Sequence, residues 1–163
     1  MMQEGGAMMI KLESGGGQLE IVEHLADHDI PVCAHLGLKP QSVHKLGGFR
    51  VQGRDPDVAE EMLSAGKRLQ DAGADIVLLE CVPNELGQAM TQQLDVPVIG
   101  IGAGPHVDGQ ILVLYDVLDI TQGRTPRFVR NFQKDHTSPL AALEANVAAV
   151  KDRSYPAPEH CFS

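Results

Sequence analysis

The chain has 163 residues and a mass of 17.5 kDa, which is enough for one ordinary domain and too little for two. Its 43% hydrophobic and 21% charged residues are close to globular averages and exclude a disordered or fibrous protein. The net charge of -9 repels phosphate backbones, so nucleic acid is excluded as the main partner. A local basic pocket for a small anion is still compatible with this balance.

Membrane and secretory segments are not expected in this sequence. No apolar run approaches the roughly 18–20 residues that cross a bilayer, and the N-terminus lacks the basic region and cleavage pattern of a secretory signal. The sequence has three cysteines, Cys33, Cys81 and Cys161, which lie far apart and lack the spacing of a metal site. Their odd number and wide separation argue against a disulfide framework. We therefore expect a cytoplasmic protein with no membrane partner.

Short apolar runs alternate with amphipathic segments along the chain. Buried parallel strands are predicted over residues 7–12, 30–36, 75–82 and 96–101, because these runs are continuously apolar. Helices are predicted over residues 18–29, 56–72, 84–94 and 139–151, with a further helix after Asp108-Gly109 and an extended C-terminal tail over residues 152–163.

This alternation predicts an α/β fold in a single domain over residues 1–163. One βα unit takes roughly thirty residues, so the chain holds about five units. A five-stranded flavodoxin-like sheet fits this length, whereas a closed (βα)₈ barrel needs roughly 250 residues. The glycine-rich run over residues 100–104 follows a late strand and precedes Pro105, which is the wrong context for a dinucleotide-binding motif.

Four chemically capable residues fall at the carboxyl ends of the predicted strands. Lys11 and Glu13 are two residues apart and share a face of the first strand, His35 ends the second, and Glu80 ends the third. Active sites of α/β folds lie beyond these strand ends. A lysine, a histidine and two carboxylates there could bind an anion, hold a divalent metal and move a proton.

Each of these residues also has a plainer interpretation. Lys11 and Glu13 could form an ion pair at a strand terminus, and His35 could be a hydrogen-bonded core histidine. Glu80 is the hardest to explain structurally, because a carboxylate after five apolar residues is costly to bury unpaired. Cys81 is interpreted as a small packed hydrophobe, since nothing nearby in the sequence would stabilise a thiolate.

Two further pairs carry weaker signals. His24 and His28, at i and i+4, could bind zinc, although their polar helix face favours solvated side chains. Asp116 and Asp119 could be carboxylate ligands, although roles at a helix end or on the surface are favoured.

Longer strings carry a resemblance to a known family. They cover residues 11–13 (KLE), 31–42 (PVCAHLGLKPQS), 47–54 (GGFRVQGR), 79–83 (LECVP) and 98–104 (VIGIGAG), and continue over residues 108–113, 126–132 and 155–156. In this order, over nearly the whole chain, they resemble ketopantoate hydroxymethyltransferase, the 3-methyl-2-oxobutanoate hydroxymethyltransferase of pantothenate synthesis.

The resemblance implies a Mg²⁺-dependent (βα)₈ barrel. In such an enzyme the keto acid loses a proton to give an enolate, which takes a one-carbon unit from 5,10-methylenetetrahydrofolate and yields 2-dehydropantoate. Residue by residue, it implies that Glu80 is the proton acceptor, that Lys11 and His35 contact the substrate, and that Glu13 belongs to the metal site. The family's multimeric habit implies a homo-oligomer.

One departure from the family is large. Its first three strands supply two metal-binding aspartates and a substrate-binding serine within a G-D-S string, and no G-D-S occurs in this sequence. We therefore expect the chain to correspond to the C-terminal five units, a partial barrel that is inactive if the chain is truncated. A smaller departure is the turn over residues 13–17, which is longer than the family's.

Two other functions remain open at the level of sequence. A related Mg²⁺-dependent enolate lyase or mutase of the isocitrate-lyase kind would share the barrel, but the K-K-C-G-H string of the lyases is missing from this sequence. The other alternative is a non-enzymatic half-barrel that serves as an assembly module.

Overall fold

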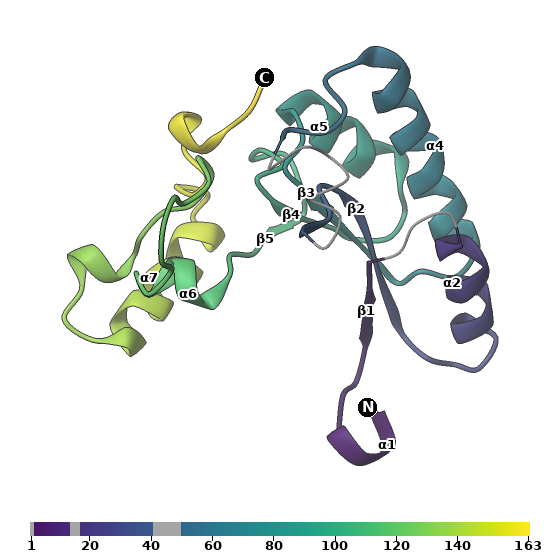
Figure 1. The fold of residues 1–163 in the computed structure, drawn as a ribbon, viewed down its shortest axis with the longest axis horizontal. Helices are drawn as coiled ribbons and strands as arrows, with labels where there is room; N and C mark the ends of the chain where they lie inside the picture. Colours follow the sequence, from purple (N-terminus) through teal and green to yellow (C-terminus); the bar gives the residue numbers. More distant parts are fainter. Residues whose placement is uncertain (1, 14–16, 41–49) are drawn as a thin grey trace.

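The computed structural model describes residues 2–13, 17–40 and 50–163, and within them a single parallel sheet organises the chain (Figure 1). Its strands run in sequential order: β1 (Ile10–Leu12), β2 (Val32–Gly37), β3 (Ile76–Glu80), β4 (Val98–Ile101) and β5 (Gly109–Gln110). The expected α/β fold with five parallel strands is confirmed. The sheet is open, with β1 and β5 at its two edges.

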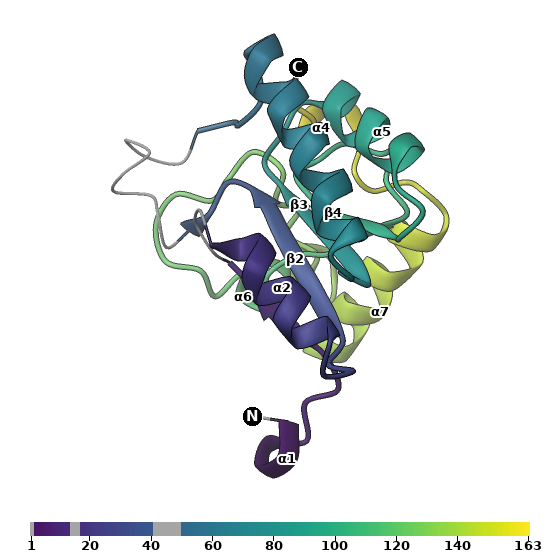
Figure 2. The same ribbon diagram turned by 90° about the vertical axis from the view of Figure 1, so that its right-hand side faces the viewer.

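Three helices cover one face of the sheet (Figures 1 and 2). They are α2 (Gln18–Ala26), α4 (Pro56–Asp71) and α5 (Asn84–Gln93), and each begins at the predicted residue. The start of α4 is fixed by Asp55, whose carboxylate accepts hydrogen bonds from the backbone of Asp57 and Val58, and by Pro56 in the first turn. Its exit passes through Gly73, whose φ of 97° is left-handed.

The main hydrophobic core lies between these helices and the sheet. Alternate strand residues such as Ala34, Val77 and Leu79 are buried there against Leu69 of α4 and Met90 of α5. The opposite residues of the same strands therefore face the other side of the sheet, which is the side that carries the predicted site residues.

Two aspartates fix the starts of β2 and β4 in the same way. Val32 donates its backbone N–H to Asp75, which precedes β3, and Val98 donates to Asp108, which precedes β5, both at 2.8 Å. Each aspartate returns a backbone N–H bond to the same partner, at 2.9 and 3.0 Å. Both strands begin at the valine of a Pro-Val pair, Pro31-Val32 for β2 and Pro97-Val98 for β4.

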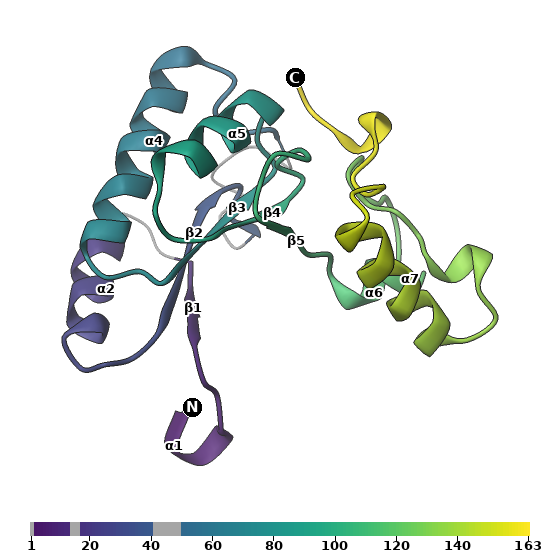
Figure 3. The same cartoon turned by 180° about the vertical axis from the view of Figure 1, so that it is seen from behind.

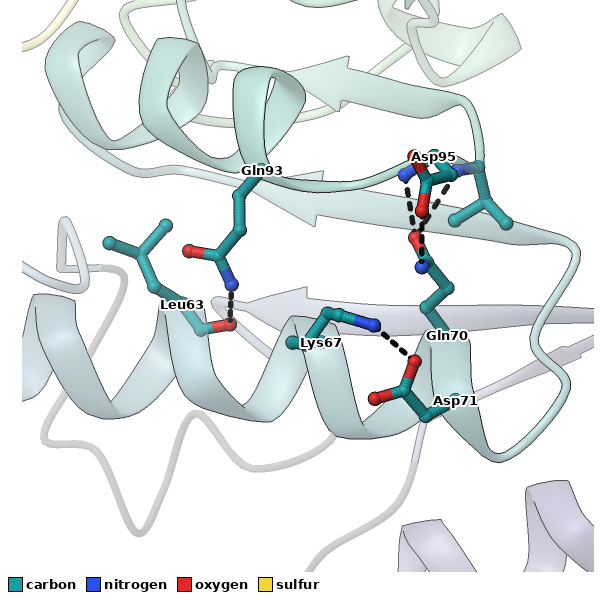
Figure 4. A network of polar contacts seen from close by, with 7 residues as sticks. Leu63, Lys67, Gln70, Asp71, Gln93 and Asp95 are labelled. Carbon is teal, nitrogen blue, oxygen red and sulfur yellow. Dashed lines mark hydrogen bonds and ion pairs between the residues drawn. The ribbon is translucent and has the colours of Figure 1, made fainter.

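A polar network ties α4 to α5 and to the segment before β4 (Figure 4). The Gln70 amide donates to Asp95 at 3.1 Å and accepts from the Asp95 backbone N–H at 2.7 Å. Gln93 of α5 donates to the Leu63 carbonyl of α4 at 3.0 Å. These bonds fix the spacing of the two helices on the sheet.

The segment after β4 differs from the expected helix. Gly109 and Gln110 form β5, paired with Ile99 and Gly100, and the only helix before residue 133 in this described segment is the single turn α6 (Leu114–Val117). The helix expected after Asp108-Gly109 is thus limited to the four residues of α6, and a strand comes before it. The reason is that Asp108 is bonded to the start of β4, which draws the following residues into the sheet.

The C-terminal segment lies beyond β5, away from α2 and α4 (Figures 1 and 3). It contains α7 (Pro139–Lys151), capped by Ser138, and two short 3₁₀ turns, η2 (Gln133–Asp135) and η3 (Pro158–His160). A small core of its own is centred on Phe132 and Tyr155. The expected tail over residues 152–163 is packed, since Tyr155 and Phe162 are buried.

At the other end of the chain, α1 (Met2–Gly5) is a single exposed turn that lies apart from the sheet (Figure 1). No helix in the described part of the chain is long and apolar enough to cross a membrane.

Candidate active site at the strand ends

The four predicted site residues meet at the carboxyl ends of β1, β2 and β3. The strand register places Lys11 opposite Cys33, one residue pair before Leu12 and Ala34, and places Gly37 opposite Glu80. Side chains of alternate residues share a face, so Glu13, His35 and Glu80 converge on the face opposite to the helices.

His35 lies at the centre of the group. Its side chain is fully buried, and its two ring nitrogens face two different carboxylates: Nδ1 is 3.3 Å from Glu13 and Nε2 is 3.2 Å from Glu80. Neither contact reaches hydrogen-bond geometry. His35 is therefore not the hydrogen-bonded core histidine of the plainer interpretation, but a buried imidazole held between two acids.

Glu13 links this buried histidine to the surface. Its Oε1 lies 2.7 Å from Lys11 Nζ, so the ion pair expected from the plainer interpretation is present. Partial burial acts to raise the pKa of Glu13, but the hydrogen bond and charge of Lys11, together with the adjacent His35 ring, lower it by more. The pKa of Glu13 thus lies below its ordinary value. Its second oxygen, Oε2, is buried without a hydrogen-bond partner.

Glu80 is a buried carboxylate at the end of an apolar strand, as the sequence indicates. Its side chain is 12% exposed and its contact is with His35. A carboxylate in this position can accept a proton from a ligand that approaches the strand ends, and the neighbouring imidazole can share the resulting proton.

Gln18 belongs to the same site and was missed by the sequence analysis. Its buried amide donates to the carbonyl of Leu12 and to the carbonyl of His35, both at 3.2 Å. The Gln18 side chain therefore links the carboxyl ends of β1 and β2. One of its bonds is to the residue before Glu13, and the other is to the backbone of His35. A glutamine at a helix start carries no sequence signal for this role.

The strand-end group supplies few of the ligands that magnesium needs. Mg²⁺ requires several oxygen ligands in octahedral geometry. The unpartnered Oε2 of Glu13 is one suitable donor, but the described residues bring together no group of three or more His, Cys, Asp or Glu side chains that could hold a metal. The described part of the chain does not form a magnesium site by itself, and the role of Glu13 as a metal ligand stays a prediction.

The weaker candidates lie elsewhere. The rings of His24 and His28 are 4.6 Å apart on the exposed side of the α2 region, and the Nδ1 of His28 contacts the His24 carbonyl at 2.8 Å. Asp116 is buried in the C-terminal segment, where it accepts a hydrogen bond from Thr121, and Asp119 is exposed in the same segment. None of these four joins the strand-end group.

A shallow cavity of about 370 Å³ lies between α4 and α5, on the helix-covered side. Its wall includes Leu63, Leu86 and Arg54 and none of the predicted site residues. The glycine-rich turn after β4 packs against other parts of the chain. Gly102 lies against the Phe128 ring, and Gly104 lies against Asn84.

The whole chain also matches known proteins. A family model described as ketopantoate hydroxymethyltransferase matches residues 1–158. The chain belongs to the ketopantoate hydroxymethyltransferase family. It is 58% identical over 162 residues to the 3-methyl-2-oxobutanoate hydroxymethyltransferase of Alkalilimnicola ehrlichii, and 53% identical over 161 residues to that of Chromohalobacter salexigens.

Each of these matches covers 99% of the chain but only 58% and 61% of the two relatives. The chain thus spans about 60% of the length of these members of the family.

Among solved structures, an aldolase from Escherichia coli K12 aligns with 93% of the chain and 52% of its own length. At 17% identity and a TM-score of 0.34, that similarity is too low to identify a fold.

Proposed function

We propose that this chain provides the proton-accepting part of a 3-methyl-2-oxobutanoate hydroxymethyltransferase active site. The observation that carries the proposal is the buried imidazole of His35 between the carboxylates of Glu13 and Glu80, at the strand ends of a chain that belongs to this family. The reaction would supply 2-dehydropantoate for pantothenate biosynthesis, with 5,10-methylenetetrahydrofolate as the one-carbon donor.

Glu80 accepts the proton from carbon 3 of 3-methyl-2-oxobutanoate. The electrons of the broken C–H bond form the enolate, whose carbon 3 bonds to the methylene carbon of 5,10-methylenetetrahydrofolate. The bonds from that carbon to the folate nitrogens break, water supplies the hydroxyl group, and tetrahydrofolate is released. Its position suits Glu80 to this step, because the carboxylate lies at the end of β3 with its side chain 12% exposed, where a keto acid at the strand ends can meet it. The Nε2 atom of His35 lies 3.2 Å from this carboxylate and fixes the direction from which the substrate can approach it.

Lys11 binds the anionic end of the keto acid. Its ammonium lies at the strand ends and is about half exposed, so a carboxylate from solvent can reach it without disturbing the core. Glu13 holds the ammonium toward the site at 2.7 Å. The keto acid thus lies between a fixed cation and a buried base, which is the geometry that proton abstraction beside a carbonyl requires.

The cellular setting follows the same proposal. We place the enzyme in the cytoplasm as a homo-oligomer, with a keto acid and a folate as its small-molecule partners. The free thiols of Cys33, Cys81 and Cys161 support a reducing compartment.

Deuterium washout tests the proposal directly. Loss of the carbon 3 proton of 3-methyl-2-oxobutanoate in D₂O is followed by NMR, with the chain alone and together with the part of the Alkalilimnicola ehrlichii enzyme that it does not match. The Glu80→Gln variant keeps the side-chain shape but cannot accept the proton, so exchange should fall about 10²- to 10⁴-fold while keto-acid binding changes little.

Glu61→Gln is the matched control, because Glu61 is an exposed carboxylate of α4 on the other side of the sheet. It should leave exchange unchanged. Normal washout in Glu80→Gln would remove Glu80 from the base role. A parent chain that exchanges no proton in either preparation would contradict the enzyme proposal and favour a non-enzymatic assembly module.

A further inference from the structure

The residue that follows Glu80 has an unusual backbone. β3 ends at Glu80, and Cys81 has a φ of 53°, in the left-handed region. A side chain with a Cβ is disfavoured there, so such a residue persists only where its surroundings hold it. Strain of this kind directly beside a buried carboxylate points to a constraint on that carboxylate.

The peptide groups after Glu80 are held by two other segments of the chain. Cys81 donates its N–H to the Ile101 carbonyl at 2.9 Å, and Val82 donates to the Gly102 carbonyl at 3.0 Å. The Cys81 carbonyl accepts the N–H of Gln52 at 2.9 Å. The turn is therefore bonded both to the end of β4 and to the segment before α4.

The carbonyl of Glu80 is held from the opposite side, by β2. Leu38 donates its N–H to this oxygen at 2.9 Å. Gly37, with a φ of 89°, lies so close that a Cβ added to it would be 2.1 Å from the same oxygen. Only glycine fits at position 37, and its absence of a side chain sets how closely β2 approaches the backbone of Glu80.

The side chain of Cys81 is buried beside the turn, which the backbone bonds hold in place. It is buried in an apolar cluster that includes Leu38, Ile101, Phe128 and Phe162. Burial, with a further contribution from the charge of Glu80, raises the pKa of this thiol to about 11. The thiol is therefore neutral and packs as a small apolar side chain.

We propose that the left-handed turn at Cys81, seated against Gly37, is a positioning device that fixes the Glu80 carboxylate beside His35. Cys81 and Gly37 are positioning residues that act through Glu80, and their purpose rests on the proposed function of Glu80 as the base. The backbone of Glu80 is thereby fixed on both sides, leaving only its side-chain torsions to place the carboxylate.

The test compares one substitution at two cysteines. In Cys81→Val, a β-branched residue resists the left-handed backbone, whereas in Cys33→Val the same change falls in the extended strand β2, where valine is favourable. Cys33 borders the same apolar cluster, which makes it the matched control. Cys81→Gly is the rescue variant, because glycine adopts the left-handed conformation without strain.

Two readouts are taken from the full chain at fixed pH. The first is the ¹⁵N shift of the His35 ring, assigned by its loss in His35→Gln, with Glu80→Gln as the reference for a lost carboxylate contact. The second is the deuterium washout described above. We expect Cys81→Val to move the His35 signal toward that of Glu80→Gln and to slow exchange about ten- to a hundredfold, with little change in keto-acid affinity.

Cys33→Val and Cys81→Gly should keep the parent signal. A second pair separates crowding from backbone strain: Gly37→Ala places a methyl group against the Glu80 carbonyl, whereas Gly123→Ala, at a φ of 95°, meets nothing within 4 Å. Only the first should shift the His35 signal. Melting curves identify a variant that does not fold, and Cys81→Ala replaces Cys81→Val in that case.

An unchanged His35 signal in folded Cys81→Val and Gly37→Ala overturns the positioning role. The role is also overturned if Cys81→Gly and Cys81→Val behave alike. Failure of the proposed function would be a separate result, seen as a parent chain that exchanges no proton. The ¹⁵N shift of His35 would still show whether this turn positions Glu80.

Discussion

Lys11 and Lys67 are two lysines of similar exposure, each paired with a carboxylate, but their neighbourhoods differ. Lys67 contacts Asp71 on the outer surface of α4 (Figure 4), whereas Lys11 contacts Glu13 beside the buried His35. An exposed pair on a helix contributes under about 1 kcal/mol and binds nothing. Because only Lys11 lies at the proposed site, comparing Lys11 with Lys67 tests whether the lysine at the site binds substrate.

Lys11→Met should weaken binding of 3-methyl-2-oxobutanoate about ten- to a hundredfold, because methionine keeps the volume of the stem and removes the charge. Lys67→Met should have no effect on binding. A calorimetric or NMR titration of the completed enzyme with the keto acid measures both. Equal affinity in Lys11→Met and the parent would leave Lys11 with only its ion pair to Glu13.

Glu13 should make the stability of the fold depend on pH. Its folded-state pKa is below the ordinary 4.5 because the lowering effects of Lys11 and His35 exceed the raising effect of burial. A lowered folded pKa stabilises the folded state above the unfolded pKa, and this contribution is lost as the pH falls through the folded value. Below about pH 4.5, the unfolding free energy should therefore fall more steeply for the parent than for Glu13→Gln.

Denaturant unfolding at a series of pH values checks this expectation, with Glu61→Gln as the exposed control. Superimposable pH dependence of the parent and Glu13→Gln would show that the pair with Lys11 does not persist in solution.

The site residues differ in how readily the sequence indicates them. Lys11, Glu13, His35 and Glu80 could be predicted because a polar residue at the end of an apolar strand is costly to bury without a partner or a ligand, and the structure brings all four together. Gln18 could not, because its two carbonyl partners come from different strands. The left-handed backbone of Cys81 depends on contacts with β2 and β4, which no local pattern encodes.

At the scale of elements, the two aspartates that start β2 and β4 are a repeated stabilising device. Asp75→Ala should lower the free energy of unfolding by about 1–2 kcal/mol, because the N–H of Val32 loses its partner. Asp75→Asn retains an acceptor oxygen and should cost less. Asp71→Ala, at an exposed position that contacts only Lys67 among the described ion pairs, is the control and should cost under about 1 kcal/mol.

Denaturant or thermal unfolding of the three variants gives the comparison. An Asp75→Ala variant as stable as Asp71→Ala would mean that water replaces the aspartate at the start of β2.

Long elements were predicted more accurately than short ones, for a physical reason. The starts of α2, α4 and α5 follow from hydrophobic periodicity and, for α4, from capping by Asp55 and Pro56. β5 has only two residues, which is too short for any periodicity, and it forms because β4 offers it a backbone to pair with. Tertiary pairing, not local propensity, therefore decides that segment.

At the scale of the whole molecule, the open sheet leaves two edges, β1 and β5, whose backbone groups face outward. Apolar side chains gather beyond the β5 edge, where Val113, Leu114, Tyr115 and Ile120 are each at least half exposed. Unpaired edges next to exposed apolar surface favour association between chains. The chain expressed on its own should therefore self-associate.

Sedimentation velocity over a range of concentrations measures this association. Replacing Leu114 and Tyr115 by serine should shift the distribution toward smaller species, and Leu140→Ser, an equally exposed position on α7, shows whether the effect is specific to the β5 edge. A monodisperse monomer that melts cooperatively would contradict the expected association.

Lys11 lies in β1, which is an edge strand, and Glu13 follows directly after the end of this strand. Whatever chain segment pairs with that edge also lies beside the two residues that face the keto acid in the proposed function. Pairing of that segment with β1 would then complete both the sheet and the site, so the two events share one association equilibrium. A ligand that contacts both β1 and the segment paired with it raises the affinity between these two parts. By the same factor, their pairing raises the affinity for the ligand.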